Sequence, residues 1–100
     1  MRGMLLIVEA NSKIRSFSLK SLEESWINED YLNRGLSNAV SYKGNLIVGD
    51  FQGYVHIIDP LNGKTIGRKR LSKKPIKTLF SRSNSLYAVD EAFNLFSINI

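Results

Sequence analysis

Hydrophobic and polar positions alternate in short runs along this chain, and the clearest example spans residues 45–63 (NLIVGDFQGYVHIIDPLNG). Residues 46–48 are apolar and largely β-branched, and residues 54–58 form a second run rich in aromatic and β-branched side chains. Between the runs, Gln52-Gly53 favours a chain reversal, because glycine enters positive-φ conformations without steric cost. Residues 59–63 (DPLNG) favour a second turn. The segment therefore predicts a strand–turn–strand–turn unit.

This unit recurs on both sides of residues 45–63. A shift of 41 positions places residues 46–50 on residues 5–9, and a shift of 40 positions the other way places them on residues 86–90. A period of about 40 residues made of short strands is typical of β-propeller blades. The predicted fold class is therefore all-β, built from propeller blades.

The other apolar runs complete three groups of strands, over residues 4–27, 36–71 and 76–100. The expected strands are 4–9, 13–19, 24–27, 36–42, two within 46–59, 64–71, 76–81, 85–90 and 94–100. Three, four and three strands make about two and a half four-stranded blades, in a single partial propeller domain over residues 1–100. Because closed rings have about four to eight blades, we expect a C-terminal piece of a longer protein, or alternatively one protomer of an assembly.

Composition excludes several classes of site. The chain has no cysteine, which rules out disulfides, thiolate metal ligands and a cysteine nucleophile. Its apolar runs are far shorter than the roughly 20 residues needed to cross a bilayer. Residues 1–8 are also too short for the apolar region of a signal peptide, so the sequence predicts neither a cleavable leader nor a lipid-attachment cysteine.

The candidate catalytic side chains favour structural roles. His56 is the only histidine, and one histidine without cysteine is a poor metal site, so we expect a packing or surface role. Asp50, Asp59 and Asp90 are conceivable as calcium or acid–base carboxylates, but Asp50 and Asp90 occupy equivalent repeat positions, as turn residues would. Gly49 and Gly53 are followed by no Lys-Ser/Thr pair and no helix, so no phosphate-binding loop is predicted.

Aromatic side chains lie at repeat-linked positions. Stacking on nucleic-acid bases is one interpretation, and packing between blades is the favoured one, since aromatic rings bury a large area. The residues concerned are Trp26, Tyr42, Tyr54 and Phe80.

The net charge of +5 is concentrated in the second part of the chain. Residues 1–59 carry a net charge of −1 and residues 60–100 carry +6. Seven basic residues fall within 14 positions without an intervening acid: Lys64, Arg68, Lys69, Arg70, Lys73, Lys74 and Lys77. Such a run can bind anionic lipid headgroups or nucleic acid, but the favoured interpretation is an exposed outer strand whose lysines discourage edge-to-edge aggregation.

Residues 59–63 resemble the Asp-x-x-Thr-Gly turn of the pyrroloquinoline-quinone-type propeller repeat, which usually ends on a Trp four residues later. Trp26 occupies that closing position in the first group, whereas Gly67 occupies it in the second, which removes one ring from the packing between blades. The residues assigned to the repeat and its packing are Trp26, Gly49, Asp50, Gly53, Tyr54, Asp59 and Gly63.

From residue 26 to residue 63 the chain is similar to the last blades of the BamB family, periplasmic lipoproteins of the machinery that assembles β-barrel proteins into the bacterial outer membrane. The matching residues are Trp26, Asp30, Leu32, Arg34, Leu36, Tyr42, Gly44, Asn45, Leu46, Val48, Gly49, Asp50, Gly53, Tyr54 and His56. The resemblance implies an eight-bladed ring with no enzymatic activity and no cofactor, located on the periplasmic side of the outer membrane. It also implies binding to the barrel-inserting subunit BamA through blades that this chain does not contain, with no nucleic-acid partner.

Two alternatives remain open at this point. One is a fragment of a quinone-dependent dehydrogenase built on the same repeat, which needs cofactor and calcium ligands near the ring axis. The other is a basic module that binds anionic polymers or surfaces, which predicts a steep salt dependence of binding.

Overall fold

The computed structural model describes residues 3–99, which form ten strands and no helix. None of these residues belongs to a helix of the length and apolarity needed to cross a membrane. The strands are β1 (Met4–Val8), β2 (Ile14–Ser18), β3 (Glu24–Asn28), β4 (Val40–Tyr42), β5 (Asn45–Gly49), β6 (Tyr54–Ile58), β7 (Thr65–Arg70), β8 (Ile76–Arg82), β9 (Ser85–Asp90) and β10 (Leu95–Ile98).

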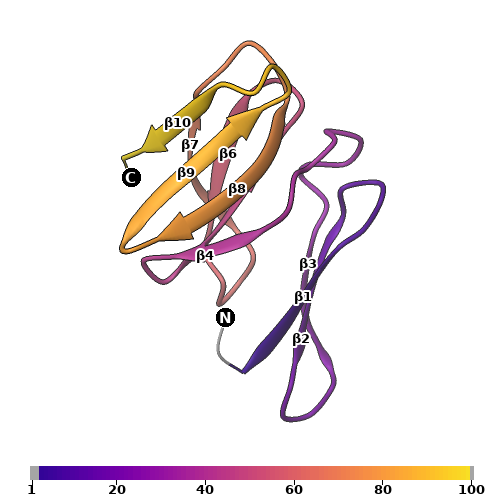
Figure 1. The fold of residues 1–100 in the computed structure, drawn as a ribbon. Coiled ribbons are helices and arrows are strands. Elements are labelled where there is room, and N and C mark those ends of the chain that lie inside the picture. Colours follow the sequence, from indigo (N-terminus) through magenta and orange to yellow (C-terminus); the bar gives the residue numbers. More distant parts are fainter. Residues whose placement is uncertain (1–2, 100) are drawn as a thin grey trace.

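The strands form three antiparallel sheets in sequence order (Figure 1). We call them blade 1 (β1-β2-β3), blade 2 (β4-β5-β6-β7) and blade 3 (β8-β9-β10). The predicted all-β class and the grouping into three, four and three strands are confirmed. Within residues 3–99, blade 1 has no strand equivalent to β4 and blade 3 has no strand equivalent to β7.

Residues at equivalent positions of the 40-residue repeat pair in the same way across the strands of each blade. The corresponding cross-strand pairs are Leu5↔Phe17, Leu46↔Ile58 and Leu86↔Ile98. The same sequence spacing therefore gives the same pairing in all three blades.

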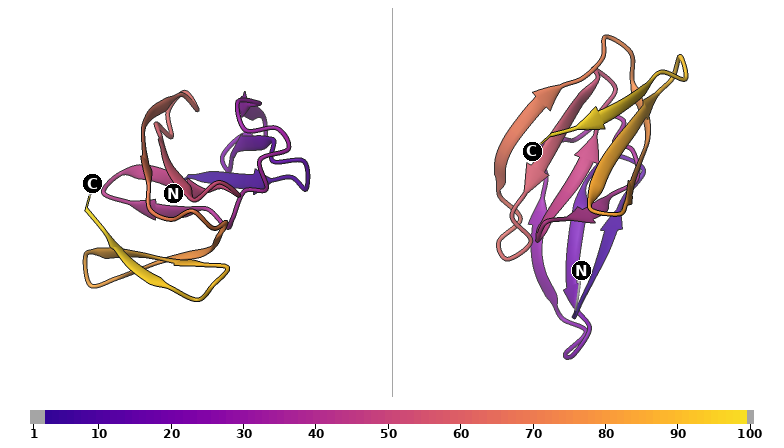
Figure 2. Two further views of the ribbon diagram at one scale, coloured as in Figure 1. Left: turned by 90° about the horizontal axis from the view of Figure 1, so that it is seen from above. Right: turned by 60° about the vertical axis from the view of Figure 1, so that its left-hand side comes forward.

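Blade 2 lies between the other two, and each of its faces packs against one neighbour (Figure 2). Leu46, Val48 and Ile58 form a buried cluster with Ile14 and Trp26 of blade 1. On the opposite face, a second cluster contains Ile47, Val55, Ile76, Leu79, Leu86, Ala88 and Ile98. Both faces of β5 and β6 are therefore apolar, because both are covered.

The innermost strand of blade 2 is shorter than predicted. A strand was expected over residues 36–42, but only Val40–Tyr42 pairs with β5. Ahead of it, the Ser37 hydroxyl accepts a hydrogen bond from Gly49 N–H (2.9 Å), and the Asn38 side chain bonds Leu79 N–H and C=O of blade 3 (both 2.9 Å). Ser37 N–H still donates to the Gly49 carbonyl (2.8 Å), so side-chain hydrogen bonds here supplement a single backbone bond and join blades 2 and 3. The end of the predicted strand 94–100 at Ile100, and residues 1 and 2, lie outside the described residues.

Candidate interaction surfaces

Trp26 joins blade 1 to the β6–β7 turn of blade 2. Its Nε1–H donates a hydrogen bond to the Pro60 carbonyl (2.8 Å), and its ring covers Gly63 so closely that a Cβ there would lie 2.3 Å from Trp26 Cε3. The Asn28 side-chain amide donates to the Gly63 carbonyl (2.7 Å). Asp59 closes the same turn by accepting the Leu61 N–H at 2.9 Å. Trp26, Asp59 and Gly63 thus meet at one joint between blades.

Gly67 stands where the repeat predicts a second tryptophan. It pairs with Ile57 across β6 and β7, just as Trp26 pairs with Ser16 across β2 and β3. Blade 2 therefore carries no indole ring at this position.

Gly49 and Gly53 lie where the start of blade 3 crosses blade 2. A Cβ at Gly49 would lie 2.4 Å from Ile76 Cγ2, and one at Gly53 would lie 1.9 Å from the Ser72 carbonyl oxygen. Ile76 N–H donates to the Asp50 carbonyl (2.9 Å), which fixes the first residue of β8 beside blade 2. Only glycine leaves room for this crossing.

Asp50 and Asp90 perform the same local task in successive blades. Each carboxylate accepts hydrogen bonds from the backbone N–H groups two and four residues later, at 2.9 and 3.0 Å for Asp50 and at 3.0 and 2.9 Å for Asp90. Both side chains are fully buried. Their equivalent sequence positions therefore correspond to equivalent turn geometry.

Asp50 also binds His56. The His56 Nε2 atom lies 2.7 Å from Asp50 Oδ2, and both side chains are buried. The Tyr31 ring packs on the imidazole with centroids 4.5 Å apart, and the Tyr31 hydroxyl bonds Thr65. Burial is the main cause that raises the pKa of Tyr31, so its hydroxyl stays neutral.

This buried Asp–His pair lacks the surroundings of a catalytic dyad. In residues 3–99 no hydroxyl group hydrogen-bonds His56, and no three metal-binding side chains gather closely enough to hold an ion. The acidic position is also paired in the other blades. Glu9 binds Arg15, which is equivalent to His56, at 2.6 Å in blade 1, whereas Asp90 of blade 3 accepts a hydrogen bond from Ser72 of the β7–β8 loop at 2.7 Å. The acidic side chain at this position is therefore engaged in a polar contact in all three blades, within the blade in blades 1 and 2 and with the preceding loop in blade 3.

The basic run separates into two regions in the structure. Arg68 and Arg70 point to one face of β7 and lie over the Tyr54 ring, with guanidinium carbons 5.0 and 5.4 Å from its centroid. Lys69 alternates to the other face of the strand. Lys64 lies in the β6–β7 turn, about 20 Å away at the other end of the six-residue strand.

Five of the seven basic residues remain near one end of the molecule. Lys73 and Lys74 lie in the β7–β8 loop, and Lys77 lies 4.8 Å above the Phe93 ring of the β9–β10 turn, which is beside that loop (Figure 1). In residues 3–99 none of the five forms an ion pair with a carboxylate. We call this group the basic end: Arg68, Arg70, Lys73, Lys74 and Lys77.

No protein-family model matches the chain. The chain is 41% identical over 64 residues to the outer membrane protein assembly factor BamB of Shewanella oneidensis, which covers 64% of this chain and 16% of that protein. It superimposes on the crystal structure of BamB from Moraxella catarrhalis with a TM-score of 0.89 and 27% identity, over 97% of this chain and 29% of that one.

The chain is similar in sequence and in fold to a segment of BamB.

The match to BamB confirms the predicted propeller blades and the predicted resemblance to the BamB family. The chain spans about a sixth of the length of the Shewanella relative. It also superimposes on the computationally designed protein Ika4 with a TM-score of 0.83 and 11% identity, over all of this chain and 62% of that one, a likeness of fold alone.

Two of the aromatic side chains predicted to pack between blades, Tyr42 and Phe80, lie in different surroundings. The Tyr42 hydroxyl donates to the Asn84 carbonyl of blade 3 (2.8 Å), so Tyr42 does lie between described blades. Phe80 is 41% exposed and stacks on Tyr87 with ring centroids 5.3 Å apart, on the face of blade 3 turned away from blade 2. Among residues 3–99, no further blade covers it.

Sequence reasoning missed the pairing of Asp50 with His56 and the bonds that Asn38 makes to blade 3. The sequence did contain a sign of the Asp50 contact, since acidic residues recur at the equivalent positions 9, 50 and 90. The sequence contains no sign of the Asn38 bonds, because a single Asn in a predicted strand does not reveal which neighbouring backbone it contacts.

Proposed function

We propose that this chain forms part of a BamB-type ring and acts as a non-enzymatic scaffold in the assembly of β-barrel proteins into the outer membrane. The observation that carries this proposal is the superposition on Moraxella BamB over 97% of the chain. The relatives are named outer membrane protein assembly factors. We place the chain on the periplasmic side, among the C-terminal blades of one propeller domain, with the barrel-inserting subunit BamA as the partner of the whole ring.

The use of the polar side chains favours a scaffold over a dehydrogenase. The carboxylates of Asp50 and Asp90 are buried and accept hydrogen bonds from the N–H groups of their own turns. The Asp59 carboxylate accepts one such bond, from the Leu61 N–H. Carboxylates engaged with backbone amides have little capacity left for calcium or a quinone cofactor. Loops at the ends of the blades are then the surfaces available for protein partners.

A segment exchange in Moraxella BamB tests this proposal. The segment that superimposes on residues 3–99 is replaced by the sequence of this chain, and the hybrid is expressed in a Moraxella strain that lacks its own BamB. We expect outer-membrane barrel proteins to return toward their normal level.

The matched control is an exchange with the superimposable segment of Ika4, which shares the fold at 11% identity. That hybrid is expected to accumulate without restoring the barrel proteins. A hybrid with this chain that is folded and abundant, yet restores nothing, would contradict the proposal.

The basic end favours a second candidate function, binding to anionic lipid headgroups. Five cationic side chains without ion-pair partners in residues 3–99 provide the charge for this contact. We expect the chain to bind phosphatidylglycerol vesicles, more weakly as salt is added, and to lose affinity on Lys73→Glu with Lys74→Glu.

The charge-matched control is Lys43→Glu with Lys64→Glu, in turns at the opposite end of blade 2. Equal loss in both double variants would show that net charge alone drives binding. Stronger binding to duplex DNA than to the vesicles would favour a nucleic-acid module instead.

A further inference from the structure

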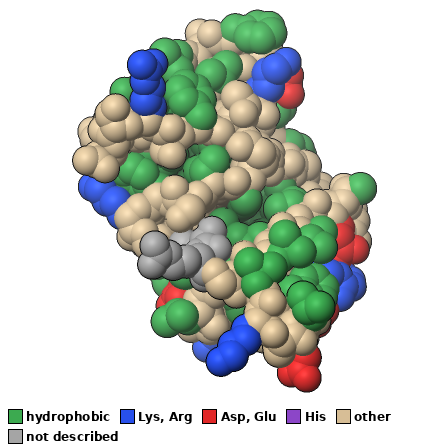
Figure 3. Space-filling view, turned by 60° about the horizontal axis from the view of Figure 1, so that its bottom comes forward, with side chains coloured by type: hydrophobic (Ala, Val, Ile, Leu, Met, Phe, Trp, Pro, Cys, Tyr) green, Lys and Arg blue, Asp and Glu red, His purple; other side chains and the backbone are tan. Residues whose placement is uncertain are grey.

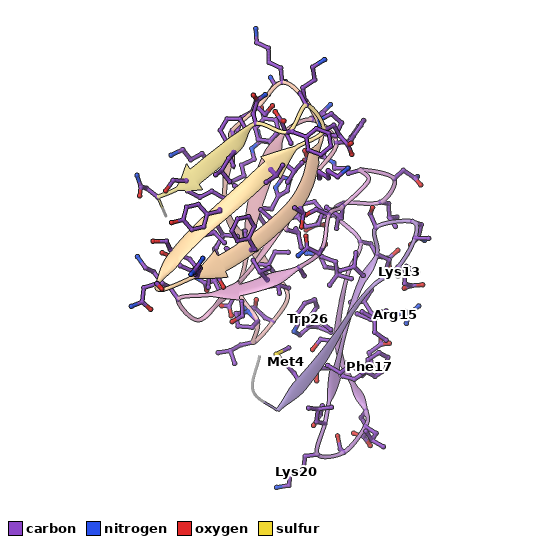
Figure 4. All side chains as sticks on the ribbon, in the orientation of Figure 1. Met4, Lys13, Arg15, Phe17, Lys20 and Trp26 are labelled. Atoms are coloured by element: carbon purple, nitrogen blue, oxygen red, sulfur yellow. The ribbon has the colours of Figure 1, made fainter. Side chains whose placement is uncertain are left out.

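Blade 1 has one face packed on blade 2 and one face in solvent. Figure 4 shows Met4 and Trp26 pointing from blade 1 toward the rest of the molecule, and Arg15 and Phe17 pointing away from it. Leu5 is 49% exposed and Ile7 is 41% exposed. Figure 3 shows hydrophobic side chains gathered on this part of the surface, at the lower right. We call Leu5, Ile7, Arg15, Phe17 and Ile27 the outer face of blade 1.

The outer face of blade 1 repeats a face that is buried twice within this structure. Leu5 is equivalent to Leu46 and Leu86, which are 1% and 0% exposed. Ile7 is equivalent to Val48 and Ala88, both fully buried. In each case the buried residues face the preceding blade.

Blade 3 presents the complementary face to solvent. Leu95 is 63% exposed, whereas the equivalent Val55 and Ile14 are fully buried against the following blade. Tyr87 is equivalent to Ile47 and is stacked by Phe80. We call Phe80, Tyr87, Val89 and Leu95 the outer face of blade 3.

We propose that these two faces bind each other in neighbouring copies of this chain, with blade 3 of one copy docked on blade 1 of the next. The contact repeats the joints between blades 1 and 2 and between blades 2 and 3, with Leu5 and Ile7 placed against Tyr87 and Leu95. The driving force is burial of apolar side chains that are already arranged in the register of the two existing joints. The contact is head-to-tail, so each copy uses two different surfaces.

The one charged group on the outer face of blade 1 is already paired. Arg15 Nε lies 2.6 Å from Glu9 and Arg15 Nη1 lies 2.8 Å from Glu24. A blade that docks on this face buries a guanidinium that is already hydrogen-bonded to two carboxylates. Burying such a paired group costs less desolvation energy than burying a free cation.

This proposal does not rest on the BamB function. In a longer chain, adjoining blades occupy both outer faces, whereas the 100-residue chain has copies of itself available. Failure of the association test therefore leaves the exchange test in Moraxella BamB unaffected.

The test is sedimentation velocity of the 100-residue chain over a wide range of micromolar concentrations. We expect the mean mass to rise with concentration. Leu5→Glu, which places a charge on the outer face of blade 1, and Leu95→Glu, which does so on blade 3, should each remain monomeric. An equimolar mixture of the two variants should form a 1:1 dimer, because each variant retains the face that the other has lost.

Leu61→Glu is the matched control, since Leu61 is 88% exposed in the β6–β7 turn and belongs to neither outer face. It should associate like the unaltered chain, and circular dichroism should show the same strand content in every variant. A chain that stays monomeric throughout, or a mixture that contains only monomers, overturns the proposal.

Cysteine pairing gives a second readout if a charged variant fails to fold. The chain has no cysteine, so Ile7→Cys and Leu95→Cys each introduce a single thiol. Under mild oxidation, the mixture should form mixed disulfide dimers faster than either variant alone forms its own dimer. Equal rates in all three samples contradict a head-to-tail contact.

Discussion

At the scale of single residues, the joint between blades 1 and 2 depends on Trp26 and Gly63. The indole is 9% exposed, covers the glycine and donates a hydrogen bond to the Pro60 carbonyl. A large side chain on one blade thus fits a position without a side chain on the next. The closing tryptophan of blade 1 thus packs on the β6–β7 turn of the next blade.

Removal of the indole should destabilise the chain strongly. Trp26→Ala is expected to cost about 3 kcal/mol of unfolding free energy, because a large buried ring is replaced by a cavity. Urea unfolding followed by circular dichroism measures the loss, since Trp26 is the only tryptophan and its fluorescence disappears with it. Leu61→Ala, at an exposed position, should change the midpoint little.

A pair of glycine variants separates crowding from backbone strain. Gly63 and Gly44 have similar positive φ values of 75° and 79°, but of the two only Gly63 has atoms within 4 Å of the point where a Cβ would lie. Gly44→Ala should cost about 1 kcal/mol from backbone strain alone, and Gly63→Ala should cost clearly more because its methyl group meets the Trp26 ring. Equal losses in the two urea midpoints would contradict the close contact.

At the scale of elements, the β7–β8 loop is attached to the β9–β10 turn through Asp90. Burial alone raises the pKa of this carboxyl, but hydrogen bonds from Ser72, from Asn94 and from the Ala92 N–H outweigh that effect and leave the pKa below its ordinary value. A lowered folded-state pKa adds stability at pH values above the unfolded-state pKa. That stability is lost as the pH falls through the folded-state pKa.

Ser72→Ala should therefore raise the pKa of Asp90 toward its ordinary value and reduce the stability lost on acidification. An NMR titration of the Asp90 carboxyl carbon measures the first effect, and urea unfolding at neutral and acidic pH measures the second. Ser97→Ala, at an exposed position on β10, serves as the control. An unchanged Asp90 titration in Ser72→Ala would show that the Ser72 hydrogen bond does not matter.

The elements also show how far the sequence predicts the structure. The β5–β6 hairpin was predictable because its apolar runs and its Gln52-Gly53 turn are both local signals. The start of β4 was not, because Ser37 and Asn38 bond to segments distant in the sequence. The basic run looked like one patch in the sequence, but the length and alternation of β7 separate Lys64 and Lys69 from the basic end.

At the scale of the whole molecule, order should decrease from blade 2 toward both ends. Blade 2 is covered on both faces, whereas β1 and β10 are edge strands of blades with one outer face each. Hydrogen exchange should be slowest at the amides of β5 and β6 and fastest at those of β1 and β10. Uniform exchange across all three blades would contradict this gradient.

The placement of these blades within a larger BamB-type ring is tested most directly by the genomic DNA ahead of the Met1 codon, read in all three frames. We expect further repeats of about 40 residues with the same strand–turn–strand pattern, behind a lipoprotein signal. DNA without such repeats would contradict the ring and leave the chain to act through its own two outer faces and the basic end.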